Sequence, residues 1–237
     1  MPLWRKAFAE LLGSALLAAT VVGSGIAAQR LSPNDRGLEL LVNSLITGAV
    51  LVALILALGP VSAAFNPAVT LAERALGAIT TRAAAVFVAA QVVGCCVGVI
   101  VANLMFAVPA VNLSRHHRSS GGLWLSEVVA TFGLLVVIFG VVRAGRSSMV
   151  AFAVGGYITA AYWFTSSTSF ANPAITIGRT LSDTFAGIAP SSVPMFVLMQ
   201  LLGAALAVGA VLALYPDAQA VADDVTRLDR AVMHETR

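Results

Sequence analysis

The tripeptide Asn-Pro-Ala occurs twice, at Asn66-Pro67-Ala68 and at Asn172-Pro173-Ala174, each time between long apolar runs. Asn is a strong helix N-cap because its side chain accepts a hydrogen bond from a free amide of the first turn. Pro is favoured as the first helical residue, where its missing N–H costs nothing. Each tripeptide therefore predicts a helix start. A helix start buried between apolar runs is costly unless its amides line a polar cavity, so the pair predicts such a cavity.

The apolar runs identify the protein class. The chain of 237 residues is 59% hydrophobic and 11% charged, whereas soluble domains carry about 25% charged residues. We therefore predict an all-α membrane protein, and we interpret the net charge of +3 as a topology signal rather than a nucleic-acid footprint. Runs of about 20 apolar residues mark membrane spans, and we place six of them near residues 7–29, 38–59, 83–107, 123–142, 149–166 and 193–214.

The six spans fall into two similar halves of one membrane domain, residues 7–108 and 123–215. Each half contains a half-helix too short to cross a bilayer, predicted at 66–76 and 172–182. Three pairs of residues correspond in order between the halves: Glu10 with Glu127, Asn66 with Asn172, and Gln91 with Gln200. Three spans per half is an odd number, so the second copy must be inverted. Inverted repeats place a site near the membrane midplane, at the repeat interface.

Charge placement predicts the orientation. With the N-terminus inside, nine of the 14 Lys and Arg residues fall on the inner side and five on the outer side, as the positive-inside rule favours. Residues 216–237 mix acidic and basic side chains, which is typical of a solvated cytoplasmic tail.

Two half-helices meeting end to end indicate a function. Their N-termini each carry about half a positive charge, and the side chains of Asn66 and Asn172 add hydrogen-bond donors. This combination passes neutral hydroxylated molecules and repels cations. No cluster of metal ligands and no Ser/His/acid set accompanies it, so we expect neither an enzyme nor a cofactor. An ion-coupled transporter is the alternative from another class, but the acids of the spans, Glu10, Glu39 and Glu127, lie near span ends.

From about Phe8 to Leu214 the sequence resembles the major intrinsic protein family, the aquaporins and aquaglyceroporins. The paired Asn-Pro-Ala motifs in an inverted repeat carry this resemblance. It implies a right-handed bundle of six tilted spans and two half-helices in the plasma (inner) membrane, with both termini cytoplasmic. It also implies a homotetramer with four pores, in which Glu10 and Glu127 hold the re-entrant loops by hydrogen bonds.

The resemblance implies a selectivity constriction on the outer side of the Asn pair. Carried over by spacing, its positions are Thr47, Ala160, Ser169 and Ile175, with Ile46 in place of Thr47 if no gap is allowed. Ile175 stands where the family normally has an arginine. Such a ring contains no aromatic residue and no fixed charge. We therefore expect a wide constriction that passes larger neutral solutes, with a water-selective pore as the alternative.

Arg179 lies four residues after Ile175, on the same predicted helix face, and two hypotheses apply to it. It reaches back to the constriction as a displaced arginine, or it forms a salt bridge with Asp183 at the same four-residue spacing. The stretch from Asn172 to Gly187 also resembles bacterial members of the family that are associated with arsenic resistance. That narrower resemblance implies arsenite, as neutral As(OH)3, or its methylated form as a solute beside glycerol-like polyols and water.

Overall fold

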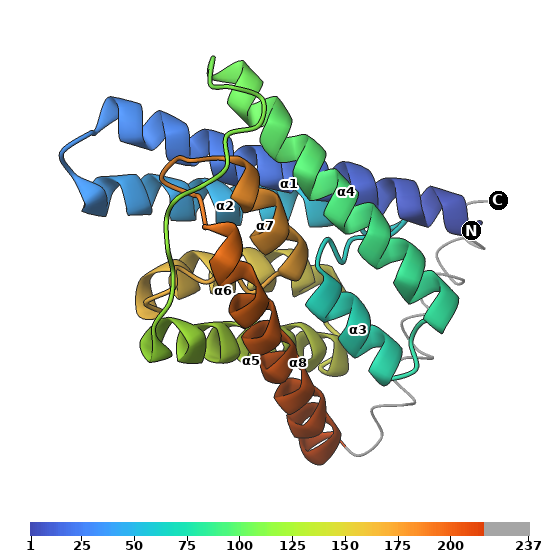
Figure 1. The fold of residues 1–237 in the computed structure, drawn as a ribbon. Helices are drawn as coiled ribbons and strands as arrows, with labels where there is room; N and C mark the ends of the chain where they lie inside the picture. The colour runs from blue at the N-terminus through green and yellow to red at the C-terminus, as the bar shows by residue number, and fades with distance from the viewer. Residues whose placement is uncertain (216–237) are drawn as a thin grey trace.

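The computed structural model describes residues 1–215, and the predicted cytoplasmic tail 216–237 lies outside the described residues. The described chain is all-helical (Figure 1). Its α-helices are α1 (Leu3–Leu31), α2 (Arg36–Leu58), α3 (Pro67–Ala75), α4 (Thr81–Met105), α5 (Gly121–Arg143), α6 (Val150–Phe164), α7 (Pro173–Gly178) and α8 (Val193–Leu214). Short 3-10 turns cover Ser147–Met149, Arg179–Leu181 and Pro190–Ser192.

Five segments of the described chain are long and apolar enough to cross a membrane: α1, α2, α4, α5 and the segment that ends with α8. The predicted fifth span, 149–166, appears as α6, which has only 15 residues and ends at Phe164. The described chain thus has eight α-helices in the expected order, of which five are long and apolar enough to span a membrane and α6 is shorter than predicted. The protein is an all-α membrane protein.

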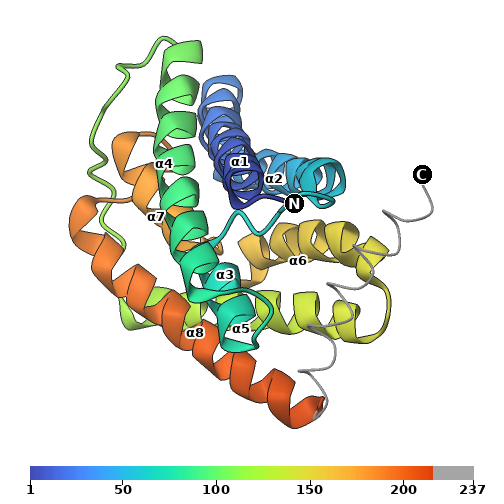
Figure 2. The same ribbon diagram turned by 90° about the vertical axis from the view of Figure 1, so that its right-hand side faces the viewer.

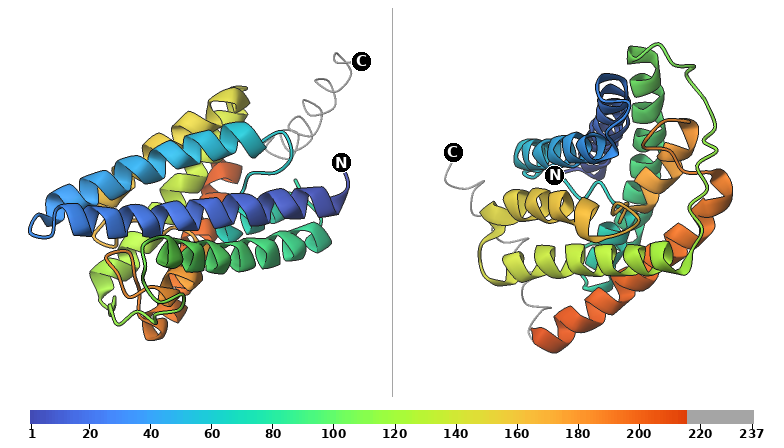
Figure 3. Two further views of the ribbon diagram at one scale, coloured as in Figure 1. Left: turned by 90° about the horizontal axis from the view of Figure 1, so that it is seen from above. Right: turned by 90° about the vertical axis from the view of Figure 1, so that its left-hand side faces the viewer.

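The two halves pack in the same way. In the first half α1 packs along α4, and in the second half α5 packs along α8 (Figure 2). Between the halves α2 contacts α6, α3 contacts α8 and α4 contacts α7. Figure 3 shows the same bundle from two further sides, with the half-helices among the longer helices. Each half-helix thus packs against the last long helix of the other half.

We call the end of the bundle that carries the N-terminus the N-terminal face. The end that carries the α1–α2 turn and residues 106–120 is the distal face. Helix α1 runs from the N-terminal face to the distal face. Because successive long helices alternate in direction, the α2–α3 and α5–α6 connections lie on the N-terminal face. From the middle of the bundle, α3 runs towards the N-terminal face and α7 towards the distal face.

Glycine permits the close approach of the long helices within each half. A Cβ atom on Gly203 of α8 would lie 2.5 Å from the carbonyl oxygen of Val128 on α5. The corresponding residue of the first half, Gly94 of α4, lies in the same way against the carbonyl of Leu11 on α1. Any larger residue at either position would force the helices apart, so both glycines are required for this close packing.

Gly77 ends the first half-helix. It has φ +85°, a conformation that glycine adopts without strain. The amide of the next residue, Ala78, donates to the carbonyl of Glu73 at 2.9 Å, as at other glycine-terminated helices. The second half-helix has no such glycine, and α7 passes directly into the 3-10 turn Arg179–Leu181.

Candidate solute pathway

Both half-helices begin at the asparagine of the motif, as the tripeptides predict. The Oδ1 atom of Asn66 accepts from the amide of Ala68 at 2.9 Å. The Oδ1 atom of Asn172 accepts from the amides of Ala174 at 3.0 Å and Ile175 at 3.2 Å. Pro67 and Pro173 take the first helical position. The oxygen of each asparagine is thus bound within its own half-helix, and the amide nitrogen points elsewhere.

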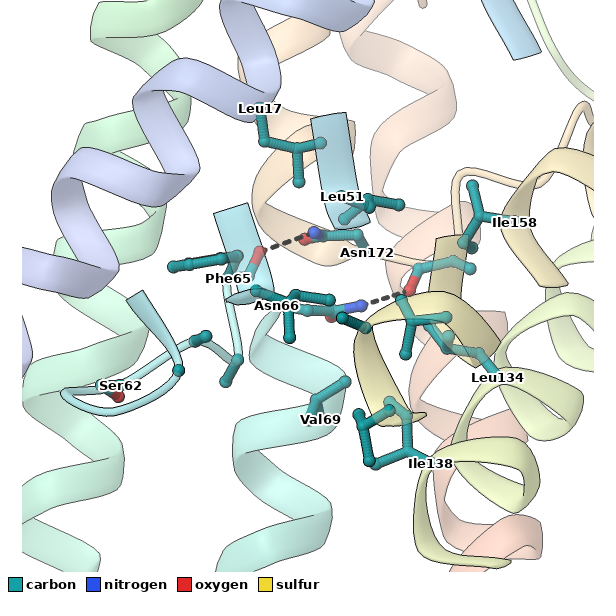
Figure 4. Close-up of a pocket in the computed structure, with 18 of the residues that line it drawn as sticks. Leu17, Leu51, Ser62, Phe65, Asn66, Val69, Leu134, Ile138, Ile158 and Asn172 are labelled. Atoms are coloured by element: carbon teal, nitrogen blue, oxygen red, sulfur yellow. Dashed lines mark hydrogen bonds between the residues drawn. The ribbon is translucent and has the colours of Figure 1, made fainter. Parts of the chain in front are cut away.

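The two amide nitrogens join the halves reciprocally. Asn66 Nδ2 donates to the carbonyl of Ala171 at 2.7 Å, and Asn172 Nδ2 donates to the carbonyl of Phe65 at 2.8 Å (Figure 4). Phe65 and Ala171 have φ +49° and +47°, so the left-handed backbone before each motif is part of this arrangement. An amide nitrogen carries two hydrogens. Each asparagine therefore keeps one donor for the cavity that it lines.

The buried carboxylate of Glu10 holds the loop before the first motif. It accepts from Ser62 Oγ at 2.5 Å and from the amides of Ala64 at 2.9 Å and Phe65 at 2.7 Å. Gln91 Nε2 donates to the same carboxylate at 2.8 Å. Four donors surround one carboxylate, which is how a charge is kept in an apolar setting.

Glu127 does the same for the second loop. It accepts from the amides of Phe170 at 3.0 Å and Ala171 at 2.9 Å and from Gln200 Nε2 at 2.6 Å. The symmetry extends to two hydroxyls that sequence reasoning missed. Gln91 Nε2 lies 2.9 Å from Thr70 Oγ1, and Gln200 Nε2 lies 2.8 Å from Thr176 Oγ1. Each threonine follows its motif asparagine by four residues, which is the signal that could have found them.

A cavity of about 510 Å³, the long cavity, runs between the two halves past both asparagines (Figure 4). Towards the N-terminal face it is lined by Lys6, Glu73 and the hydroxyls of Ser147 and Ser148. Its middle has the asparagine amides on one side and aliphatic side chains around them: Leu17, Val21, Leu51, Ile55, Val69, Leu134, Ile138, Val154 and Ile158. A polar stripe on an otherwise apolar wall suits a solute with hydroxyls on one edge and carbon on the other.

Three of the predicted constriction residues, Thr47, Ser169 and Ile175, line the long cavity. The alternative Ile46 does not, because it is 41% exposed on the outer surface of α2. Ala160 is a wrong assignment: it is exposed and lies outside the cavity lining. The cavity instead receives Tyr162, one turn after Ile158 on the inner face of α6.

The distal end of the long cavity is therefore neither free of aromatic residues nor free of charge, contrary to the expectation from sequence. The hydroxyl of Tyr162 lies 3.2 Å from Thr47 Oγ1, within hydrogen-bond distance. Phe170 and Arg179 line the same end of the cavity. The distal end of the long cavity is therefore more polar than a ring of Thr, Ala, Ser and Ile would be, and larger side chains line it.

Arg179 does not pair with Asp183, and the salt-bridge hypothesis for it is wrong. Asp183 instead binds Arg115 Nε at 3.2 Å and lies 3.7 Å from His116 Nε2. Arg179 is only 2% exposed, its Nε donates to the carbonyl of Ala186, and its Cζ lies 3.5 Å from the ring centre of Phe170. It lines both the long cavity and a second cavity at the distal face. Arg179 thus stands at the junction of the two.

Comparisons with known proteins agree with this architecture. The family model described as Major intrinsic protein matches residues 1–163. The chain is 49% identical over 206 residues to Aquaglyceroporin AqpS of Rhizobium meliloti (strain 1021), which covers 86% of this chain and 88% of that protein. It is 28% identical over 171 residues to Aquaporin NIP1-2 of Arabidopsis thaliana, covering 67% of this chain and 57% of that one. The crystal structure of the aquaglyceroporin from Plasmodium falciparum has the same fold, with a TM-score of 0.71 at 19% identity, over 92% of this chain and 99% of that chain.

Proposed function

The chain belongs to the major intrinsic protein family, a family of channels and not of enzymes, and on that premise we propose a passive pathway for small uncharged solutes. The solutes we propose are water, glycerol-like polyols and trivalent arsenic as As(OH)3 or its methylated form. The observation that carries the proposal is the pair of asparagine amides, each with a free donor facing one cavity between the halves.

The middle of the long cavity supports neutral solutes. Both half-helix N-termini are directed there, so their partial positive charges raise the energy of a cation, hydronium included. The aliphatic wall offers a cation no replacement for its water shell. A hydroxylated neutral molecule can accept hydrogen bonds from Asn66 and Asn172 and turn its carbon side to the wall.

The distal end supports polyols over water alone. Ile175 gives the constriction an apolar side, and Thr47 with Tyr162 gives it a hydroxyl side. Glycerol presents three hydroxyls on a carbon chain, and As(OH)3 has similar size and three hydroxyls. The relative in Rhizobium meliloti is named an aquaglyceroporin, which agrees with this solute class. Arg179 supplies a positive charge one helical turn beyond Ile175, so we propose that it takes over part of the missing arginine's role.

We also propose a homotetramer in the plasma (inner) membrane, with both termini cytoplasmic and the distal face outside. Large apolar side chains are exposed along the helices that face outwards, among them Leu16 on α1, Leu45 on α2 and Leu206 on α8. Lipid and neighbouring copies would cover these surfaces. Among residues 1–215, six Lys and Arg residues belong to the N-terminal face and five to the distal face, and this small difference has the sign that the positive-inside rule favours.

Stopped-flow light scattering on proteoliposomes tests the proposal, with water, glycerol and arsenite influx compared with empty vesicles. The wild type should conduct all three faster than empty vesicles. Ile175→Arg should slow glycerol and arsenite more than water, because the long cationic side chain narrows the apolar side of the constriction. Ile175→Val is the matched control, and its influx of water, glycerol and arsenite should equal that of the wild type. Influx of water alone in the wild type would favour the water-selective alternative, and influx of none of the three would refute the channel.

A further inference from the structure

The second cavity, which we call the distal cavity, has a volume of about 270 Å³ and lies at the distal face beyond Arg179. Its polar lining is dominated by cationic and ionisable side chains: Arg36, Glu39, His116, Arg118 and Arg179. The proposed flux of neutral solutes gives no reason for three arginines around one small space.

Two of these arginines share one aromatic ring. The Cζ atom of Arg179 lies 3.5 Å from the ring centre of Phe170, and that of Arg118 lies 5.1 Å from it. Their Nε atoms are fixed by neighbouring carbonyls, Arg179 to Ala186 and Arg118 to Gly187 at 3.1 Å. Both guanidinium groups are thus held rigidly, with Nε occupied.

The terminal nitrogens of both arginines have no protein partner within residues 1–215. The carboxylate nearest in sequence, Asp183, is engaged by Arg115 and His116, and Glu127 is engaged by the loop amides and Gln200. Arg179 is 2% exposed. Glu127 acts on both guanidinium groups through its charge but makes no hydrogen bond with either. A buried charge that lacks hydrogen-bond partners is costly, and a guanidinium binds oxyanions with two parallel hydrogen bonds. One carboxylate, that of Glu39, lines this cavity against three arginines, so the cavity keeps an excess of positive charge that suits an added oxyanion.

Glu39 adds a second requirement on the ligand. Its side chain on α2 is 3% exposed, lines the same cavity, and makes no hydrogen bond with any other described residue. An ionised carboxylate only accepts hydrogen bonds, so it favours a ligand that also carries a hydroxyl hydrogen. The carboxylate of Glu39 would repel a dianion that carries no hydroxyl hydrogen.

We propose that the distal cavity is a binding site for a small, partly protonated oxyanion. Arg118 and Arg179 would bind the charged oxygens of this ion, and Glu39 would accept a hydrogen bond from the ion's hydroxyl group. Ions of this class include dihydrogen phosphate, hydrogen carbonate and hydroxycarboxylates. Because Arg179 also borders the long cavity, a bound ion would sit at the distal entrance of the solute pathway and hinder flux. The binding site itself stands on the distal cavity alone and does not require the pathway to conduct.

Calorimetric titration of the full chain in detergent tests the site, with sodium phosphate at mildly acidic pH and with sodium chloride and sodium sulfate at matched ionic strength. We expect saturable phosphate binding, weaker sulfate binding and none with chloride. Arg118→Gln and Arg179→Lys should each weaken phosphate binding by about tenfold or more, because each removes charge-assisted hydrogen bonds. Glu39→Gln should reduce the preference for phosphate over sulfate.

Arg82→Gln, an exposed arginine at the start of α4 on the opposite face, is the matched control and should bind phosphate like the wild type. Equal phosphate binding by wild type, Arg118→Gln and Arg179→Lys would overturn the proposal, as would an absence of saturable binding in the wild type. Thermal unfolding shows that each variant is folded before titration.

Glycerol influx in proteoliposomes, with and without external phosphate, separates this inference from the proposed function. Slower influx with phosphate in the wild type, but not in Arg118→Gln, supports a site at the entrance. Influx without any phosphate effect, together with failed titration, overturns the site and leaves the channel standing. Phosphate binding without any influx leaves the site standing and refutes the channel.

Discussion

The Nδ2 atom of Asn66 lies 2.7 Å from the carbonyl oxygen of Ala171, a residue 105 positions away in the other half of the chain. This hydrogen bond and its counterpart from Asn172 to Phe65 join two helix starts that each half forms by itself. The amide nitrogen therefore has a structural role beside its proposed contact with solute.

Asn66→Ser should separate these two roles. Serine keeps the helix cap but cannot reach the carbonyl of Ala171, which then lies buried without a donor. We expect a loss of about 1–3 kcal/mol in stability and slower glycerol influx. Asn66→Ala should lose about 1 kcal/mol more, because it also removes the cap. Chemical unfolding in detergent and stopped-flow influx measure the two effects, and equal stability of the two variants would argue against a separate cap contribution.

Glu127→Gln should destabilise the second loop. The N–H groups of Phe170 and Ala171 donate to different oxygens of the carboxylate, at 3.0 and 2.9 Å. The NH2 group of a glutamine would therefore face one of these two N–H groups, whichever way the amide is turned. Hydrogen bonds to a charged group contribute roughly 1.5–3 kcal/mol each, so we expect a clear drop in Tm. Asp35→Asn is the matched control, since Asp35 is an exposed N-cap of α2 and Asn caps equally well. An unchanged Tm in Glu127→Gln would remove the case for the carboxylate as the loop's anchor.

Gly203→Leu should prevent proper packing of α8 against α5, because even a Cβ atom would lie 2.5 Å from the carbonyl of Val128. We expect a loss of folded protein or a destabilisation of several kcal/mol, roughly that of severe overpacking. Gly209→Ala on the same helix has open space around it and should be neutral or stabilise by about 0.4–1 kcal/mol. Yield of monodisperse protein and Tm compare the two variants directly.

Tyr162→Phe should change solute selectivity, whereas Ala160→Leu should not. The first substitution removes the hydroxyl 3.2 Å from Thr47 and makes the hydroxyl side of the constriction apolar. We expect glycerol and arsenite influx to fall several-fold, by about the value of one hydrogen bond. Ala160 is exposed outside the cavity, so leucine there should leave influx unchanged. An effect of Ala160→Leu larger than that of Tyr162→Phe would restore the assignment from spacing.

Acid should release Asp183 from Arg115 and His116, a set of contacts that we call the tether. The backbone N–H of Arg115, together with its guanidinium and His116, lowers the pKa of Asp183 below its ordinary value of 3.8. Because the pKa is lowered, the tether contributes its full stabilisation when the pH is above the ordinary pKa of aspartate. This stabilisation is lost as the pH falls through the lowered pKa. Hydrogen exchange of the Arg115 amide, corrected for its intrinsic rate, should therefore be slow at neutral pH and accelerate only below about pH 3.8. In Asp183→Asn the exchange should lack this acid transition.

The sequence predicts best where local chemistry decides. The helix starts at Asn66 and Asn172 follow from capping and from proline at the first position. The first half-helix, predicted at 66–76, ends at Ala75, two residues before a glycine whose φ is positive. The correspondence of Glu10 with Glu127 indicated the inverted repeat because the same loop must be held twice.

Spacing arguments failed where the backbone is irregular. The assignment of Ala160 counted back from Asn172 across residues 165–171, where Thr168 and Ser169 have φ +64° and +49°. A count along the chain does not tell which side of α6 a residue faces when an irregular loop separates the helix from Asn172, so Tyr162 was missed. The expected pair of Arg179 with Asp183 assumed a continuing α-helix, but α7 ends at Gly178 and the chain leaves the 3-10 turn at Ser182 in an extended conformation. Asp183 is therefore free to hold Arg115.

The reciprocal bonds of Asn66 and Asn172 have a consequence for biosynthesis. The first half of the chain is synthesised before the second. The amide nitrogen of Asn66 therefore has no hydrogen bond with the carbonyl of Ala171 until the second half has been made. The first motif can cap its own half-helix at once, yet the lining of the pathway is complete only after α7 has inserted. Insertion of the second half is therefore the step that completes both the lining of the pathway and the two hydrogen bonds across it.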